Sequence, residues 1–204
     1  MKSLKENFQK ANIVIIGSGI IGKFKALELS ELGFHITIID PAQHHNSSNA
    51  ALGLLMGNMY QKRRGRSWDL RKKSIELWPQ WITFLQKFNY ELNIEKPLIQ
   101  ITTNQEKFKK LEKFVYENND PTLLILERDS IIIKNINKAF QTKNIKGMIS
   151  FKDGRINSYS LLQTLDKYLK HKKVNYLQEE IIKIRKSNNQ WISRTRLKYY
   201  SKDK

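Results

Sequence analysis

Cysteine is absent from this sequence of 204 residues, which excludes disulfide bonds, thiolate metal sites and a cysteine nucleophile. Long apolar runs are also missing, since no segment approaches the roughly 20 apolar residues of a membrane-spanning helix. Residues 1–10 mix charged and polar side chains and lack the apolar core of a signal peptide. Paired carboxylates for hydrolysis, a serine nucleophile elbow and a P-loop are absent as well. These absences predict a soluble, cytoplasmic protein without a membrane partner.

Acidic residues are scarce relative to basic ones, because 19 Asp and Glu against 37 Lys and Arg give a formal net charge of +18. Such a charge attracts polyanions, so a basic nucleic-acid-binding protein is one interpretation. Lysine is nevertheless spread over the whole chain, and the densest basic segment is confined to residues 62–73. The spread favours a solvated basic surface on a globular protein, which the 40% hydrophobic composition also supports.

The segment Ile13–Asp40 has the pattern of a βαβ unit. Residues 12–16 form a β-branched apolar run, typical of a parallel strand buried on both faces. Apolar residues at helical spacing follow over residues 20–32, Gly33 ends the helix, and residues 34–39 form a second strand. A strand, a helix and a strand in this order give a right-handed crossover and a parallel pair. We therefore predict an α/β fold with a Rossmann-like parallel sheet at its N-terminal end.

The turn between the first strand and the helix matches the pattern G-x-G-x-x-G. The first glycine permits the tight turn, the second lets the backbone approach a pyrophosphate, and the third lets the helix pack closely on the sheet. The N-terminus of the helix then presents free N–H groups to the anion. These features predict a dinucleotide site formed by Gly17, Ser18, Gly19, Ile20, Ile21 and Gly22.

Asp40 follows the second strand at the spacing where a carboxylate accepts hydrogen bonds from the adenosine ribose. A carboxylate there disfavours a ribose 2′-phosphate, and hence NADP. Lys23 and Lys25 lie early in the helix, where a solvated outward face would tolerate them and where they would add positive charge near the phosphates. After Asp40 the chain enters a loop rich in Ser and Asn, residues 44–58, instead of the next helix of a nicotinamide-binding domain. This interruption favours a flavin fold.

The remaining elements are predicted from periodicity and turn residues. A long helix begins near Ser67, is kinked at Pro79 and runs through Phe88. Further helices are predicted at residues 105–116 and 160–170. Strands are predicted at residues 98–102, 130–133, 148–151, 174–177 and 180–184, and a last strand from Trp191.

Three segments resemble the D-amino-acid oxidase and glycine oxidase family of FAD-dependent oxidoreductases. Residues 46–55, with the sequence NSSNAALGLL, resemble the small-residue loop that follows the second strand of that family. Residues 71–79 resemble its long helix, and residues 153–157, DGRIN, resemble the segment that re-enters its FAD domain. The resemblance implies FAD as cofactor and a small amine or amino acid as substrate. It also implies oxidation of a C–N bond to an imine, with electrons passed to oxygen.

The resemblance assigns further residues to the cofactor site. Ser47 and Ser48 would contact the phosphates or ribose, and the backbone of Ile181 would meet the adenine. A loop of small residues can lie close to a flat isoalloxazine ring because a glycine within it has no Cβ. The residues beside the ring would be Leu52, Gly53 and Leu54.

The resemblance also implies two domains and a missing part. Residues 1–60 and 152–204 would form an incomplete FAD-binding domain, and residues 61–151 part of an α+β substrate domain. In that family the arginine that binds the substrate carboxylate comes from a part absent here, so no catalytic residue is predicted. A truncated remnant that binds FAD weakly or not at all, and has no turnover, is therefore an alternative function. The adjacent His44 and His45 would point apart, so a loop is favoured over a metal site.

Overall fold

The computed structural model describes residues 12–42, 47–140, 144–187 and 190–197. The chain divides into two compact units. The first unit comprises Met1–Ala51, Lys87–Tyr90 and Ser158–Lys204, and the second comprises Leu52–Gln86 and Glu91–Asn157. Since each unit joins segments that are far apart in the sequence, contacts of long sequence separation define both.

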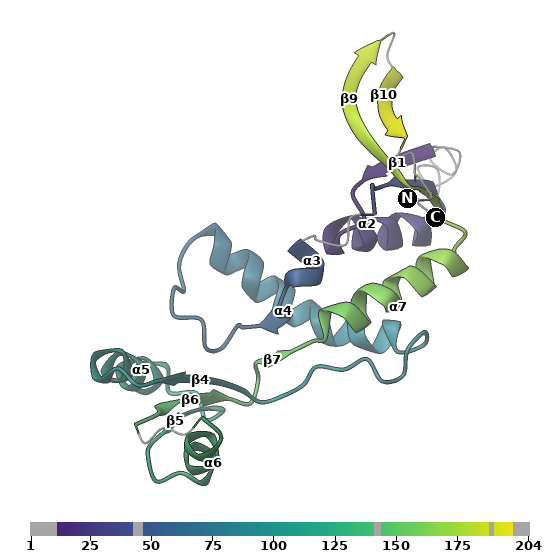
Figure 1. The fold of residues 1–204 in the computed structure, drawn as a ribbon. Helices are drawn as coiled ribbons and strands as arrows, with labels where there is room; N and C mark the ends of the chain where they lie inside the picture. Colours follow the sequence, from purple (N-terminus) through teal and green to yellow (C-terminus); the bar gives the residue numbers. More distant parts are fainter. Residues whose placement is uncertain (1–11, 43–46, 141–143, 188–189, 198–204) are drawn as a thin grey trace, which may run out of the picture. The chain divides into compact units, whose positions relative to one another are not determined.

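The first unit is built on a parallel sheet (Figure 1). Strand β1 pairs in parallel with β2, from Asn12 opposite His35 to Ile16 opposite Ile39. Strand β8 pairs in parallel with β2, giving the order β1-β2-β8, and β9 and β10 form an antiparallel hairpin. The predicted βαβ unit and the α/β fold class are therefore confirmed. The elements are β1 (Asn12–Ile16), α2 (Ile20–Glu31), β2 (His35–Ile39), α3 (Ser47–Ala50), α7 (Ser158–His171), β8 (Asn175–Leu177), β9 (Glu179–Ser187) and β10 (Gln190–Leu197).

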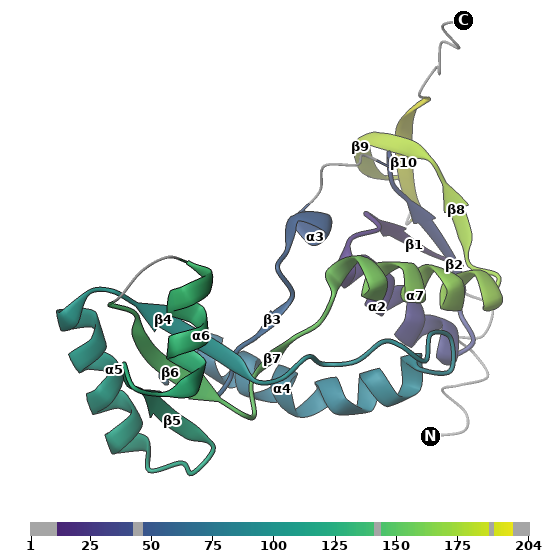
Figure 2. The same cartoon turned by 60° about the horizontal axis from the view of Figure 1, so that its bottom comes forward.

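Helices α2 and α7 lie side by side and share the core of the first unit (Figures 1 and 2). The hydroxyl of Tyr168 donates to the carboxylate of Glu31 at 2.5 Å, and Lys172 binds the same carboxylate at 2.6 Å. The hydrogen bond from Lys172, followed by that from Tyr168, lowers the pKa of Glu31. Apolar burial supplies most of the packing, through Ala26, Leu27, Ile36, Ile38, Leu161, Leu165 and Leu169.

The second unit has an antiparallel sheet in the order β4-β6-β5, together with a two-stranded ladder of β3 and β7 (Figure 2). Its elements are β3 (Leu54–Leu55), α4 (Arg66–Leu85), β4 (Leu98–Thr102), α5 (Gln105–Asn118), β5 (Leu123–Leu126), α6 (Ile131–Ala139), β6 (Lys146–Ser150) and β7 (Gly154–Arg155).

Both faces of the β4-β6-β5 sheet are covered. Met148 and Ile149 are neighbours on the central strand β6, so their side chains point to opposite faces. Met148 packs in one cluster with Leu111 of α5, and Ile149 packs in another with Ile133 of α6. Helices α5 and α6 therefore pack on opposite faces, as Figure 2 also shows.

Several predicted elements differ from the observed ones. The predicted strand at residues 130–133 is wrong, because the side chain of Ser130 accepts a hydrogen bond from the Ile133 N–H at 3.1 Å and caps helix α6. Strand β5 at Leu123–Leu126 was not predicted. Helix α4 starts at Arg66 after Gly65, one residue before the expected Ser67.

Candidate functional site

The glycine turn between β1 and α2 depends on two close backbone approaches. Gly17 has a φ of +98°, a conformation that residues with a side chain rarely adopt, and its N–H donates to the Ile39 carbonyl at 2.9 Å. A Cβ on Gly22 would lie 2.0 Å from the carbonyl oxygen of Gly17. A side chain at residue 22 would therefore push the start of α2 away from the turn.

The hydroxyl of Ser48 in α3 lies at the N-terminus of α2. The Ile20 N–H donates to the Ser48 Oγ at 2.9 Å, and a Cβ on Gly19 would be 3.0 Å from the same oxygen. A helix N-terminus attracts oxygen acceptors because its first N–H groups have no partner within the helix. The structure thus brings Ser48 to the predicted phosphate site, with Ser47 beside it in the same helix.

The carboxylate of Asp40 closes the other side of the turn. Its Oδ2 accepts from the Ser18 N–H and its Oδ1 from the Ala42 N–H, both at 2.7 Å. Each carboxylate oxygen has a second lone pair, so Asp40 can still accept hydrogen bonds from a ligand. The side chain lies at the carboxyl end of β2, where open α/β sheets bind ligands.

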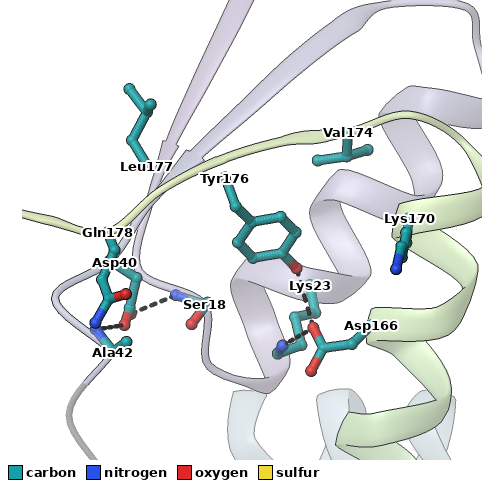
Figure 3. A pocket seen from close by; sticks show the side chains of 10 residues that line it. All are labelled: Ser18, Lys23, Asp40, Ala42, Asp166, Lys170, Val174, Tyr176, Leu177 and Gln178. Carbon is teal, nitrogen blue, oxygen red and sulfur yellow. Dashed lines mark hydrogen bonds and ion pairs between the residues drawn. The ribbon is translucent and has the colours of Figure 1, made fainter.

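Figure 3 shows the residues that line a cavity at the carboxyl end of β2, along β8 and beside α2 and α7. Its volume is about 590 Å³, within the range of small-molecule sites. Ser18 and Asp40, both predicted site residues, line it together with Lys23, which the sequence analysis placed near the phosphates. The other lining residues had no signal in the sequence: Ala42, Asp166, Lys170, Val174, Tyr176, Leu177 and Gln178. A second cavity of about 750 Å³ is lined by the glycine turn, Ser47 and Ser48.

Lys23 is not on a solvated face, contrary to the sequence-based expectation. Its side chain is 8% exposed and forms an ion pair with Asp166 of α7. The Tyr176 hydroxyl donates to the same carboxylate at 3.1 Å, and the Lys23 ammonium lies 5.7 Å from the centre of the Tyr176 ring (Figure 3). Burial, and then the negative charge of Asp166, raise the pKa of Tyr176. Lys25 is exposed as expected and pairs with Glu28.

Residues 52–54, which were predicted beside the flavin ring, belong to the second unit. Gly53 has a φ of +70°, and a Cβ there would lie 1.9 Å from the Ile156 carbonyl oxygen. Within this unit, Gly53 therefore lies close to the backbone of residue 156. The side chains of Leu52 and Leu54 are exposed. Ile181, predicted near the adenine, lies in β9 of the first unit and is opposite Thr195 of β10.

Two arginines of the basic segment at residues 62–73 support the fold. Arg63 donates to the Asn58 carbonyl at 2.6 Å and also contacts Asn118. Arg71 donates to the Met56 carbonyl at 3.0 Å and lies 4.0 Å from the centre of the Tyr60 ring. These contacts explain part of the segment without a nucleic acid.

No helix in the described parts of the chain has both the length and the apolar character needed to cross a membrane. Among the same residues, no three His, Cys, Asp or Glu side chains gather as metal ligands would. His44 and His45 lie outside the described residues.

Comparison with known proteins places this geometry in a family. Residues 12–200 match the family model described as DAO, FAD dependent oxidoreductase. The chain belongs to this DAO family of FAD-dependent oxidoreductases. FAD is the cofactor of the DAO family, and the α/β fold with its parallel sheet is similar to the fold of the solved glycine oxidase.

Individual proteins and solved structures are also similar to this chain. An uncharacterized oxidoreductase of Bacillus subtilis (strain 168) is 25% identical over 163 residues, which cover 76% of this chain and 44% of that protein. Glycine oxidase from Bacillus cereus ATCC 14579 has a TM-score of 0.69 at 22% identity, covering 86% of this chain and 50% of that one. Iminodiacetate oxidase from Chelativorans sp. BNC1 has a TM-score of 0.74 at 14% identity, and the match covers 91% of this chain and 51% of that one. The chain thus spans about half the length of these proteins.

Proposed function

We propose that the chain binds FAD and contributes the nucleotide-binding half of an amine or amino-acid oxidase. The observation that carries this proposal is the convergence of the glycine turn, Ser48 and Asp40 at the N-terminus of α2. These groups have the chemistry that an ADP moiety needs: a glycine turn at a helix N-terminus for phosphate and a carboxylate for ribose.

Each predicted residue has a role in this proposal. The turn of residues 17–22 holds the pyrophosphate at the N-terminus of α2, with Ser47 and Ser48 beside it; the Ser48 hydroxyl already accepts the Ile20 N–H there. Asp40 accepts hydrogen bonds from the adenosine ribose, and the backbone of Ile181 meets the adenine. In the second unit, Leu52, Gly53 and Leu54 contact the isoalloxazine ring.

The proposed reaction is oxidation of a C–N bond in a small amine or amino acid to an imine. FAD, when bound, supplies the hydride acceptor, and electrons then pass to oxygen. The similar solved structures named glycine oxidase and iminodiacetate oxidase support an amine-type substrate. The protein contributes position and electrostatics, and we assign no catalytic residue within this chain.

A second candidate is binding of FAD without turnover. It is favoured by the predicted site residues, which all bind the cofactor and include no catalytic group. Nucleotide affinity and turnover depend on different contacts.

Visible absorption after purification with FAD and desalting tests the proposal. We expect flavin bands with the wild-type chain and weaker retention in Asp40→Asn, because the amide presents a donor where the carboxylate accepts the Ser18 or Ala42 N–H. Asp69→Asn, at an exposed position in α4, is the matched control. A colourless wild-type protein would count against FAD binding. Anaerobic bleaching by glycine or D-amino acids then separates the oxidase from the candidate without turnover.

A further inference from the structure

We propose that Asp153 is a positioning residue that holds the loop beside the flavin ring. The proposal rests on the assignment of Leu52–Leu54 to the isoalloxazine ring. Asp153 is 1% exposed, and its carboxylate accepts three hydrogen bonds from consecutive backbone N–H groups. Oδ1 accepts from Gly57 at 2.7 Å and from Asn58 at 2.8 Å, and Oδ2 accepts from Met59 at 2.6 Å.

A buried carboxylate of this kind fixes the backbone around it. Burial of a charge is costly unless hydrogen bonds compensate for lost hydration, and bonds to an ionised acceptor are stronger than neutral ones. The three N–H groups can converge on one side chain only while residues 57–59 keep this turn. Asp153 and the turn therefore stabilise each other's position.

The residues after Asp153 hold the beginning of the same loop. Leu54 pairs with Arg155 in the ladder of β3 and β7. The Ile156 N–H donates to the Gly53 carbonyl at 2.9 Å. Arg155 in turn exchanges backbone hydrogen bonds with Glu95, at 2.9 Å and 2.7 Å. Residues 153–156 thus connect the loop at residues 53–59 to a third backbone segment.

Arg71 of α4 binds the same loop through a backbone carbonyl, whereas Asp153 binds it through backbone N–H groups. It donates to the Met56 carbonyl at 3.0 Å and stacks on the ring of Tyr60. A carboxylate therefore collects the N–H groups of this turn, and a guanidinium binds a carbonyl next to it. Side chains of both charges keep the turn in a single conformation.

This arrangement affects the flavin half of the cofactor more than the ADP half. A loop that must be ordered at the moment of binding subtracts its ordering cost from the affinity. Asp153 orders residues 57–59 in advance, next to the residues proposed to contact the ring. The glycine turn and Asp40, which bind the ADP half in our proposal, belong to the first unit and make none of these contacts.

Hydrogen exchange of the chain without cofactor tests the holding of the loop. In Asp153→Asn the amide group presents N–H to the Met59 N–H, and in Asp153→Ala all three bonds are lost. We expect faster exchange at Gly57, Asn58 and Met59, graded from Asn to Ala. Asp129→Asn, an exposed carboxylate of the same unit, is the control. Unchanged exchange in both Asp153 variants would overturn the proposal.

Titration with FAD and with ADP tests the consequence for binding. We expect Asp153→Asn to bind FAD about tenfold more weakly, the effect of losing roughly one charge-assisted hydrogen bond, with altered flavin absorption and unchanged ADP affinity. Equal loss of ADP and FAD affinity, or an unchanged FAD affinity and spectrum, would overturn the proposal. Arg71→Gln, which removes the bond to Met56, should show the same pattern and serves if the Asp153 variants do not fold. A wild-type chain that binds no FAD overturns the proposed function, and the exchange experiment still decides whether Asp153 holds the loop.

Discussion

Gly22 is the residue whose replacement should damage the nucleotide site most directly. A Cβ in Gly22→Ala would lie 2.0 Å from the Gly17 carbonyl oxygen, so α2 must move. We expect a loss of about 1–3 kcal/mol in the free energy of unfolding and a clear loss of ADP affinity. Urea denaturation and calorimetric titration measure the two effects.

The matched control for Gly22 is Gly65→Ala, at the start of α4. Gly65 has a φ of +72° but no atom within 4 Å of an added Cβ, so this variant adds backbone strain without a collision. Gly65 has a ψ of 177°, a combination that is nearly restricted to glycine, so the free energy of unfolding should fall by about 1–3 kcal/mol. The variant should nevertheless bind ADP as the wild type does. A Gly22→Ala protein with wild-type ADP affinity would contradict the close packing of the turn.

Asp120 should make the stability of the second unit depend on pH in the acidic range. Its carboxylate accepts from Lys152 at 2.8 Å and from the Thr122 N–H at 2.9 Å. The bond from Lys152, and then those from Thr122, hold the pKa of Asp120 below its ordinary value of 3.8. The stabilisation is therefore present above the ordinary pKa and is lost as the pH falls through the lower pKa of the folded state.

The variant Asp120→Asn measures this contribution. Lys152 is exposed and solvent screens the pair, so we expect the free energy of unfolding of Asp120→Asn to be about 1 kcal/mol lower near neutral pH. The difference from the wild type should shrink on acidification, as urea denaturation at several pH values would show. Asp129→Asn should change little at any pH. A difference for Asp120→Asn that stays constant into acid would disprove the linkage.

The structural roles of residues could be predicted where they depend on neighbours in the sequence. They could not be predicted where they depend on contacts with residues far away in the sequence. The turn geometry of Gly17, Gly22 and Asp40 could be predicted because one short segment contains both the glycine pattern and the spacing to the carboxylate. Lys23 was misjudged, since its partner Asp166 is 143 residues away. Asp153 was noticed as part of a family-like segment, but its bonds to residues 57–59 have no signal in the sequence.

Elements with strong local signals were also predicted well. The βαβ unit and the strands β4 and β8 follow from apolar patterns, and strands were also predicted at residues 180–184 and from Trp191, within β9 and β10, although their pairing as a hairpin was not. The run Ile131–Ile133 misled the prediction because β-branched residues favour strands, whereas the Ser130 cap and packing on the sheet select a helix. Strand β5 is short, at 4 residues, and its pairing with β6 is a tertiary contact.

The ion pair between α2 and α7 should respond differently to the loss of each partner. Lys23 is buried, whereas the side chain of Asp166 is 50% exposed. Lys23→Met keeps the apolar volume and leaves a carboxylate that water can solvate, so stability should change by less than about 1 kcal/mol. Asp166→Asn leaves a buried ammonium without its counter-charge and should cost about 1–3 kcal/mol.

Denaturation of the two single variants and the double variant checks this asymmetry. The double variant Lys23→Met with Asp166→Asn should recover most of the loss, because no buried charge remains. Lys25→Met, which removes an exposed pair with Glu28, should change stability by a few tenths of a kcal/mol. A greater loss from Lys23→Met than from Asp166→Asn would refute the argument.

At the scale of the whole molecule, the sequence predicted the family and the cofactor more securely than the reaction. The family match covers residues 12–200, but the chain corresponds to about half of each similar solved structure. The division into two units arises from distant pairings, such as β2 with β8 and β3 with β7. Periodicity does not report such pairings, since each strand alone has the same pattern whatever its partner.

Within the described residues, β1 is an edge strand of the parallel sheet, and this should make the chain prone to self-association. Val14 and Ile16 are each 54% exposed beside its unpaired backbone groups. An apolar open edge accepts further strands, and lysine on an edge opposes such pairing. We expect concentration-dependent association in sedimentation velocity that decreases in Val14→Lys. Tyr116→Lys, which makes the same kind of change at an 87% exposed site on α5, should leave it unchanged. Equal association of the wild type and Val14→Lys, or an equal decrease in both variants, would show that β1 is not the contact.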